Sequence, residues 1–251
     1  MESGLLPDLG PLAWVLLAVA AVIVGLGKTA VPGATTIAVA IFAAVLPARQ
    51  STGTLLLLLI VADVFAVLAY RRHADWRALL RLAPAVIVGL GLGVVFLAFA
   101  DDAGVKRVIG VILLVVIAIT LLRRRMAPAV ADAAPHPVAA ATYGSLGGFT
   151  TMVANAAGPV MSMYFLAARF SVKQFLGTAA WFFALVNLSK VPFSIGLGLI
   201  TVPGVLLDLV LVPLVIAGAL GGRWIADRID QALFERLVIV FTIVGAVYLL
   251  I

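Results

Sequence analysis

Ten apolar segments, separated by charged and turn-forming residues, restrict this chain more than any other feature of its sequence. A bilayer core about 30 Å thick requires roughly 20 helical residues to cross it, and the last three segments of each half approach that length. With 65% hydrophobic and only 11% charged residues, the chain cannot cover a soluble fold with polar surface. We therefore predict an all-α polytopic membrane protein with 8–10 membrane segments. The apolar segments lie at 11–26, 34–47, 54–70, 82–100 and 105–122, and at 138–154, 159–168, 175–197, 205–222 and 234–251.

The two halves of the chain resemble each other. Residues 49–54 align with 173–178 at an offset of 124, and the same offset places Asp63 on Asn187. After a short insertion the offset becomes 129, which pairs proline, glycine and charged positions in order. Such matches are much harder to obtain by chance than matches of Leu, Val and Ala. We predict a first membrane repeat at 1–125, a linker at 126–137 and a second membrane repeat at 138–251.

The distribution of Lys and Arg predicts the orientation of the chain in the membrane. If the N-terminus faces outward, twelve of the 17 basic residues fall on the cytoplasmic side and three on the outer side. This places both termini outside and the linker 126–137 in the cytoplasm of a multi-pass inner-membrane protein. The first segment is expected to remain in the protein, because its flank is acidic and its removal as a signal peptide would destroy the repeat.

Each half crosses the membrane an odd number of times, so the repeats are inverted. The first two segments of each half are short, and a Gly- and Pro-containing break at 25–33 or 155–159 joins them. They can form full spans or a re-entrant hairpin, which gives each repeat a broken hairpin plus three transmembrane helices. Inverted repeats with broken segments at matching positions indicate a transporter whose binding site lies near the bilayer midplane.

The two breaks supply four candidate binding residues. Lys28 and Thr29 lie in the first break, where a cation and the free N–H groups of a following helix can face an anion. Asn155 and Gly158 lie in the second break, where a side-chain amide and exposed backbone N–H groups offer further donors. In the alternative interpretation, Lys28 extends to the nearer interface and Asn155 makes an interhelical hydrogen bond.

Further polar residues lie within the later apolar segments. Asn187 and Lys190 are three residues apart and therefore share a helical face. Inverted symmetry predicts that Asp63 reaches a depth similar to that of Asn187. A buried Asp63 near Lys28 or Lys190 would form an ion pair and would be a candidate for proton coupling, whereas the alternative is a static pair that only neutralises charge. Asp208 lies close to the start of its segment and is expected at the outer interface.

Several function classes find no support in the sequence. The motifs of nucleophilic hydrolases, zinc proteases and phosphate-binding loops are missing, so we predict no enzyme. The absence of Cys excludes thiol chemistry, and His73 and His136 are expected in loops, so no metal site or cofactor is predicted. Because the basic residues are explained by membrane orientation, we expect no nucleic-acid partner; the expected partners are a small anion and the lipid bilayer.

Motifs in both halves resemble the TauE/SafE sulfite exporter (TSUP) family. The first half contributes Gly-Leu-Gly-Lys at 25–28 with Pro-Gly at 32–33, Pro-Ala-Arg-Gln at 47–50, Ala-Asp at 62–63, and 70–76. The second half contributes 175–183 and Asn-Leu-Ser-Lys-Val-Pro at 187–192. Family members often have a denser glycine run after the first lysine, where this chain has Thr-Ala-Val at 29–31. This departure affects the identity of the anion rather than the anion site itself.

The resemblance implies a secondary transporter that moves a small sulfur-containing anion, sulfite or an organosulfonate such as sulfoacetate, across the inner membrane. Export is the expected direction, with Asp63 as the candidate for proton coupling. Two alternatives are a passive anion channel and a transporter of another small organic anion, and the sequence is compatible with a homodimer. The predicted substrate-binding residues are Lys28, Thr29, Asn155, Gly158, Asn187 and Lys190.

Overall fold

The computed structural model describes residues 9–101 and 137–230 continuously, together with 7, 103–105, 107, 108, 111, 232–234, 236, 237 and 240. Every regular element in this part of the chain is a helix, and five of the helices are long and apolar enough to cross a membrane. The prediction of an all-α polytopic membrane protein is therefore confirmed. The predicted segments at 105–122 and 234–251 lie mostly outside the described residues, as do His136 and the linker before residue 137.

The helices follow the predicted apolar segments closely. In the first repeat the structure has α1 (Pro11–Thr29), η1 (Pro32–Ala34), α2 (Thr35–Val45), α3 (Ala48–Tyr70), η2 (Arg71–His73) and α4 (Trp76–Phe99). In the second repeat it has α6 (Pro137–Ala154), α7 (Ala157–Ala167), α8 (Val172–Gly196) and α9 (Val202–Ala226). Helices α2 and α7 have 11 residues each. At 1.5 Å per residue they are about 16 Å long, roughly half the thickness of the bilayer core.

Polar side chains define where the later helices begin. Asp75, Ser171 and Thr201 precede α4, α8 and α9, and each accepts a hydrogen bond from a backbone N–H in the first turn. Such caps satisfy N–H groups that have no partner within the helix. The backbone N–H of Asp75 also donates to Thr178 Oγ1 at 2.9 Å. The start of α4 is thereby fixed beside the start of α8, at one end of the bundle.

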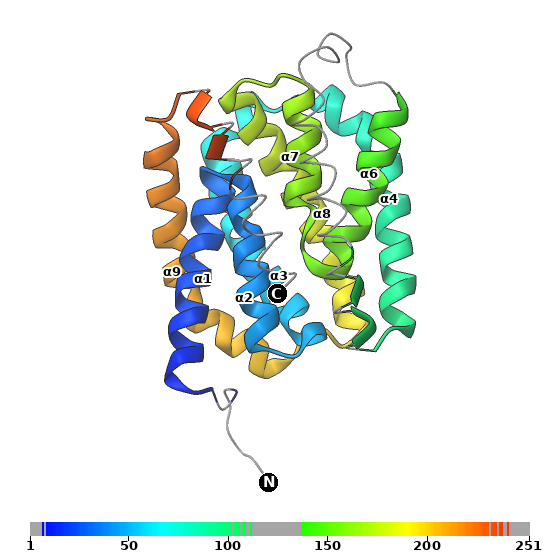
Figure 1. Ribbon diagram of the computed structural model, residues 1–251, viewed down its shortest axis with the longest axis vertical. Coiled ribbons are helices and arrows are strands. Elements are labelled where there is room, and N and C mark those ends of the chain that lie inside the picture. Colours follow the sequence, from blue (N-terminus) through cyan, green and yellow to red (C-terminus); the bar gives the residue numbers. More distant parts are fainter. Residues whose placement is uncertain are drawn as a thin grey trace.

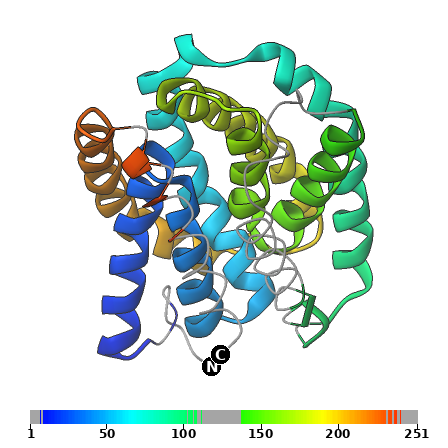
Figure 2. The ribbon, with the colours of Figure 1, turned by 45° about the horizontal axis from the view of Figure 1, so that its top comes forward.

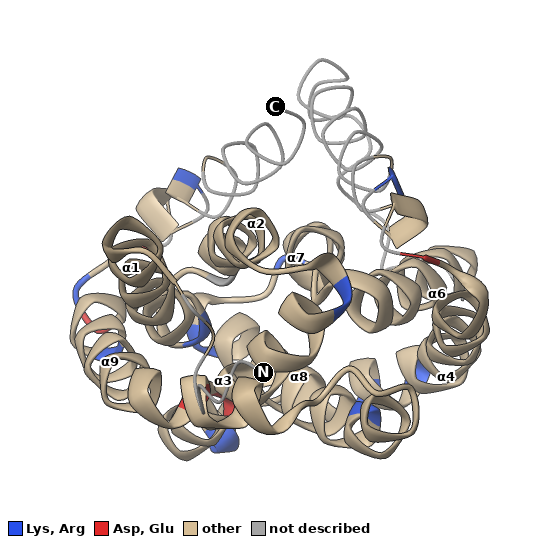
Figure 3. Ribbon diagram, turned by 90° about the horizontal axis from the view of Figure 1, so that it is seen from below, with Lys and Arg blue, Asp and Glu red and all other residues tan. Residues whose placement is uncertain are grey.

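The two repeats exchange helices rather than forming separate halves. Helix α1 packs along α9 on one side of the molecule, and α4 packs along α6 on the other (Figure 1). The view in Figure 2 shows the same pairs, with α3 and α8 adjacent between them. Seen along the helices, α2 and α7 lie next to each other across the centre (Figure 3). Each side of the bundle therefore contains one helix from the first repeat and one from the second.

Matching glycines permit these close helix contacts. A side chain at Gly25 of α1 would overlap the backbone of Val215 in α9. A side chain at Gly148 of α6 would overlap the backbone of Val86 in α4 in the same way. Val86 and Val215 are 129 residues apart, the offset at which the sequence aligns these two helices. The α1–α9 and α4–α6 contacts thus use glycines in corresponding ways, and small residues allow helices to approach at such short range.

Replacing Gly218 by valine is expected to lower the free energy of unfolding by about 3 kcal/mol or more, because overpacking forces the backbone apart. The added Cβ would overlap the backbone of Val22 in α1. The matched control is Gly221→Val in the same helix, where nothing lies within 4 Å of the added Cβ. Both changes carry the same intrinsic helix cost. Thermal unfolding of the purified proteins in detergent measures the difference, and equal midpoints would contradict the role of Gly218.

Candidate functional site

Three ionisable side chains from three helices are buried together within the bundle. Lys28 of α1 is 8% exposed, and Asp63 of α3 and Lys190 of α8 are each 1% exposed. Charged groups inside a membrane protein are costly and mark functional positions. We call these residues and their polar partners Thr151, Asn155 and Asn187 the buried cluster.

Lys28 and Asp63 form an ion pair. Lys28 Nζ lies 2.7 Å from Asp63 Oδ1 and 4.0 Å from the centre of the Phe183 ring. Of the two lysines considered as partners of Asp63, the structure pairs it with Lys28. The first break is shorter than expected, because α1 continues as a helix through Thr29 and places Lys28 in its last turn. Lys28 thus reaches Asp63 from a rigid helix, and the alternative that it extends to the interface is wrong.

Asp63 and Asn187 meet across the two repeats. Asn187 Nδ2 donates to Asp63 Oδ2 at 2.6 Å. The expectation that inverted symmetry brings these two matched positions to a similar depth is confirmed. The carboxylate is consequently held from both sides, by an ammonium from α1 and an amide from α8.

Lys190 is surrounded by neutral oxygens. Its Nζ donates to Asn155 Oδ1 at 2.5 Å, to Thr151 Oγ1 at 3.2 Å and to Asn187 Oδ1 at 3.3 Å. An ammonium has three donors, and all three are engaged. No carboxylate of the described residues lies within ion-pair distance of this ammonium. Its positive charge is therefore hydrogen-bonded but not neutralised.

The second break positions Asn155 between the two central helices. Asn155 follows the last residue of α6 with a φ of 54°, a left-handed conformation that asparagine tolerates better than most residues. Its Nδ2 donates to the carbonyl oxygen of Thr52 in α3 at 2.8 Å, while its Oδ1 accepts from Lys190. Asn155 thus links α3 to α8. It makes the interhelical hydrogen bond of the alternative interpretation, and it does so as a member of the buried cluster.

The two remaining predicted residues occupy different surroundings. The Thr29 hydroxyl donates to the carbonyl oxygen of Ala219 in α9 at 2.9 Å. The carbonyl oxygen of Gly25, one turn earlier in α1, lies 3.1 Å from the same hydroxyl. The structure therefore directs Thr29 toward α9 rather than the cluster. Gly158 is buried in the first turn of α7, which begins two residues after Asn155. First-turn N–H groups lack intrahelical acceptors, so this helix start adds donors beside the cluster. The two breaks also meet, because α7 packs against η1.

With both lysines protonated and Asp63 ionised, the buried cluster carries more positive than negative charge. It contains the two ammonium groups of Lys28 and Lys190 and one carboxylate, that of Asp63. A buried charge without a counter-ion is strongly unfavourable unless a ligand or a partner compensates it. A small anion would supply the missing negative charge, and the amides of Asn155 and Asn187 would supply hydrogen bonds to it. The arrangement is therefore suited to binding a small oxyanion.

A family model described as Sulfite exporter TauE/SafE matches residues 17–249. The chain belongs to this family. The match includes both breaks and all six residues of the buried cluster, and it confirms the resemblance drawn from the sequence motifs. No curated protein and no solved structure matches the chain. This TauE/SafE protein is therefore a multi-pass membrane transporter, and its cluster is the candidate site for the transported ion.

Thr151 is the cluster residue that sequence reasoning missed in this TauE/SafE protein. The glycine contacts align α1 with α6 at an offset of 123, since Gly25 corresponds to Gly148. At that offset Thr151 corresponds to Lys28. The second repeat thus has a hydroxyl where the first has an ammonium, and Lys190 supplies the cation from α8 instead. The offset of 123 comes from the glycine contacts, whereas the sequence offset of 124 pairs Lys28 with Met152, so the sequence alone contains no signal for Thr151.

Sequence reasoning also missed two buried hydroxyl groups that lie next to the breaks. Thr36 of α2 and Ser162 of α7 are 1% and 2% exposed. Neither hydroxyl oxygen has a hydrogen-bond partner among the described residues. Both lie on the short helices that follow the breaks, so they offer donors to an ion that passes between these helices. A single Ser or Thr in an apolar helix gives no sequence signal that separates this role from ordinary packing.

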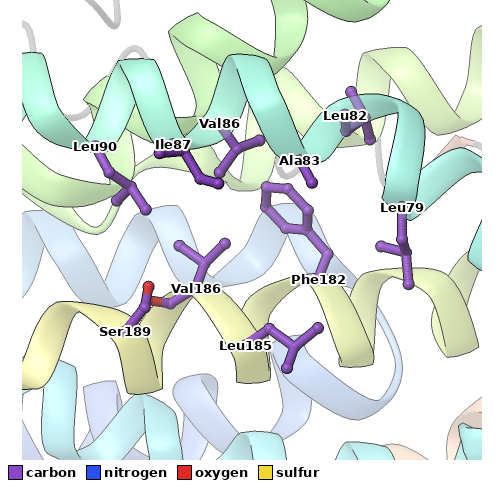
Figure 4. A pocket seen from close by; sticks show the side chains of 10 residues that line it. All are labelled: Leu79, Leu82, Ala83, Val86, Ile87, Leu90, Phe182, Leu185, Val186 and Ser189. Carbon is purple, nitrogen blue, oxygen red and sulfur yellow. The ribbon is translucent and has the colours of Figure 1, made fainter.

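Two clefts beside α8 are too apolar to bind an anion. The first encloses about 210 Å³ between α4 and α8, and the hydroxyl of Ser189 on its wall donates to the carbonyl oxygen of Val186 (Figure 4). The second encloses about 230 Å³ between α3 and α8 and reaches Asp63 among apolar side chains. Within the described residues, no three His, Asp or Glu side chains are grouped to hold a metal ion. The charged partners for an anion therefore lie in the buried cluster.

Proposed function

We propose that this protein is a secondary transporter that moves sulfite, or an organosulfonate such as sulfoacetate, across the inner membrane. The observation that carries the proposal is the Lys190 side chain, which is buried among three neutral oxygens and has no carboxylate partner among the residues that the structure describes. An anionic sulfur group would provide the compensating charge. The family description agrees with this class of substrate.

The proposed binding site uses both repeats. Lys190 supplies the charge, Asn155 and Asn187 supply side-chain donors, and Gly158 contributes backbone N–H groups at the start of α7. Charge-assisted hydrogen bonds of this kind are about twice as strong as neutral ones. Because an incoming oxyanion replaces neutral acceptors around Lys190, binding need not break an ion pair. Thr29 is left out of the proposed site, since its hydroxyl is directed toward α9.

Proton coupling in this proposal depends on the Lys28–Asp63 pair. When a proton binds Asp63, the carboxyl becomes neutral and Lys28 loses its counter-ion. Lys28 then becomes available as a second cation for the anion, so proton binding and anion binding favour each other. Proton and anion would consequently move in the same direction, which for this protein we propose to be outward. The cluster performs no bond-breaking chemistry in this scheme, so we propose no enzymatic activity.

The proposed orientation places the basic end of the bundle in the cytoplasm. The end of α3 and the start of α8 lie together, since Gly177 packs against the backbone of Tyr70 and His73. This end carries Arg71 and Arg72, and the basic residues of other connections precede α8 and follow α9. An excess of Lys and Arg on one side is typical of the cytoplasmic face.

Counterflow in proteoliposomes tests the proposal. Vesicles are loaded with unlabelled sulfite, diluted into labelled sulfite, and then challenged with sulfoacetate, other sulfonates and carboxylates. A carrier is expected to show saturable uptake that is stimulated by internal sulfite and inhibited by the preferred sulfur anions. Uptake that neither saturates nor depends on internal substrate would instead indicate a channel. Inhibition by carboxylates alone would overturn the choice of sulfur anions.

A further inference from the structure

Asp208 is a second buried carboxylate that the buried cluster does not include. It is the seventh residue of α9 and is only 4% exposed, so it is buried in the bundle although it lies near the start of its helix. Neither of its carboxylate oxygens has a hydrogen-bond partner among the described residues. The sequence places it near the start of α9, but helix rotation directs it toward the neighbouring helices α1 and α3.

No cation in the described part of these helices pairs with Asp208. Lys28 of α1 is paired with Asp63. Arg49 of α3 donates to the carbonyl oxygens of Leu97 and Ala100 at the end of α4, at 2.7 and 2.8 Å. The other ionisable groups of these helices are Tyr70 of α3, whose hydroxyl donates to the Thr29 carbonyl oxygen, and Arg223, fifteen residues further along α9.

A further buried polar group at the start of α9 is the hydroxyl of Thr54 in α3. It is buried, has no hydrogen-bond partner in the part of the chain that the structure describes, and lies 2.8 Å from where a Cβ of Gly204 would stand. Gly204 is one helical turn before Asp208 on the same face of α9. Counted from the end of the bundle where α9 begins, the hydroxyl of Thr54 comes first and the carboxyl group of Asp208 lies further inward.

A proton suits this site better than a metal ion. An ionised carboxylate without a partner in an apolar interior is strongly unfavourable, whereas the protonated carboxyl carries no charge. Hard metal cations require about six oxygen ligands, and among the described residues no three His, Asp or Glu side chains are grouped to hold a metal ion here. The chemistry of the site therefore favours protonation.

The position of Asp208 places it between one membrane face and Asp63. Gly204 and Thr54 are in contact, and Asp208 lies four residues, or about 6 Å, further along α9. Asp63 lies nine residues, or about 13 Å, further along α3 than Thr54. Both helices begin at this same end, where Gly53 packs against the backbone of Leu199. Asp208 is thus at an intermediate depth on the α3–α9 interface.

We propose that Asp208 is a proton-binding carboxyl between Asp63 and the face at which α9 begins. It passes protons from Asp63 to that face during export and supplies them to Asp63 when transport runs inward. The transfer of protons between Asp208 and Asp63 rests on the proposed proton-coupled transport. The protonation of Asp208 does not depend on that proposal. The two parts therefore require separate measurements.

Infrared spectroscopy of the reconstituted protein tests the protonation. At neutral pH the wild type is expected to show the C=O stretching band of a protonated carboxyl, and Asp208→Asn is expected to lose it. Asparagine has the same shape and no charge, so the variant should fold. The control is Asp230→Asn, in which the exposed acid is replaced at a helix start where asparagine also caps. A band that is unchanged in Asp208→Asn would overturn the protonation of Asp208.

Transport driven by a pH gradient tests the supply of protons to Asp63. Asp208→Asn is expected to reduce gradient-driven sulfite uptake at least tenfold, with a clearly smaller reduction in sulfite counterflow. Equal losses in both assays, or no loss in either, would overturn the proton-supply role. If the wild-type protein showed no sulfite counterflow, the proposed substrate would be wrong, while the infrared result would still decide whether Asp208 binds a proton.

Discussion

Replacing Lys190 by glutamine is expected to reduce labelled-sulfite counterflow at least 100-fold, equivalent to about 2.7 kcal/mol. Glutamine keeps a flexible polar side chain but removes the cluster cation for which the described residues provide no carboxylate partner. The buried amides would then face the anion without a compensating charge, which is a much weaker arrangement. Initial rates at several sulfite concentrations would show whether the loss is one of affinity.

Lys173→Gln provides the matched control for Lys190. Lys173 lies on the same helix but is exposed at its first turn, so its replacement is expected to leave counterflow unchanged. Both variants should insert into the membrane and elute as single species in detergent. Counterflow above half of the wild-type rate in a folded Lys190→Gln variant would be incompatible with the proposed anion site.

Removing Lys28 alone is expected to destabilise the protein by about 3–5 kcal/mol, because it leaves the buried carboxylate of Asp63 without its counter-ion. The double variant Lys28→Gln/Asp63→Asn removes both charges and is expected to recover most of that stability. Sulfite transport should nevertheless stay low in the double variant, since both the second cation and the proton-binding carboxyl are absent. Thermal unfolding and counterflow on the same preparations measure the two effects separately.

The comparison between the single and double variants is the informative step. If the effects of Lys28→Gln and Asp63→Asn simply added, the two side chains would not be energetically coupled. Full transport in the stable double variant would identify the ion pair as a static structural feature. That result would leave Lys190 as the anion site but remove Asp63 from proton coupling.

Much of the fold can be predicted from properties that are visible directly in the sequence. The bilayer requires long apolar helices, and their boundaries are visible as charges, prolines and caps such as Asp75. The offset of 124 paired Asp63 with Asn187, and an inverted repeat necessarily brings matched positions to related depths. The contact between these two side chains could therefore be predicted without knowing the rotation of either helix.

Other features depend on helix rotation and packing, which the sequence alone does not specify. Gly27 next to Lys28 suggested a broken chain, yet the backbone there stays helical, since a bilayer offers no alternative hydrogen-bond partners. Thr29 is adjacent to Lys28 but is directed toward another helix. Asp208 is close to a helix start but is turned inward. In each case the side-chain direction is decided by the neighbouring helix.

The pairing of α1 with α9 and of α4 with α6 has a consequence for how the protein is made. During synthesis α1 leaves the ribosome long before α9 has been made. The glycine surface of α1 that packs against α9 is therefore in the bilayer without this partner until α9 follows. A single repeat has no such partner within its own chain. An ancestral half-length protein would have needed a second copy, inserted upside down, to make the same contacts. Gene fusion would then have turned that dual-topology dimer into one polypeptide in which neither half is self-sufficient.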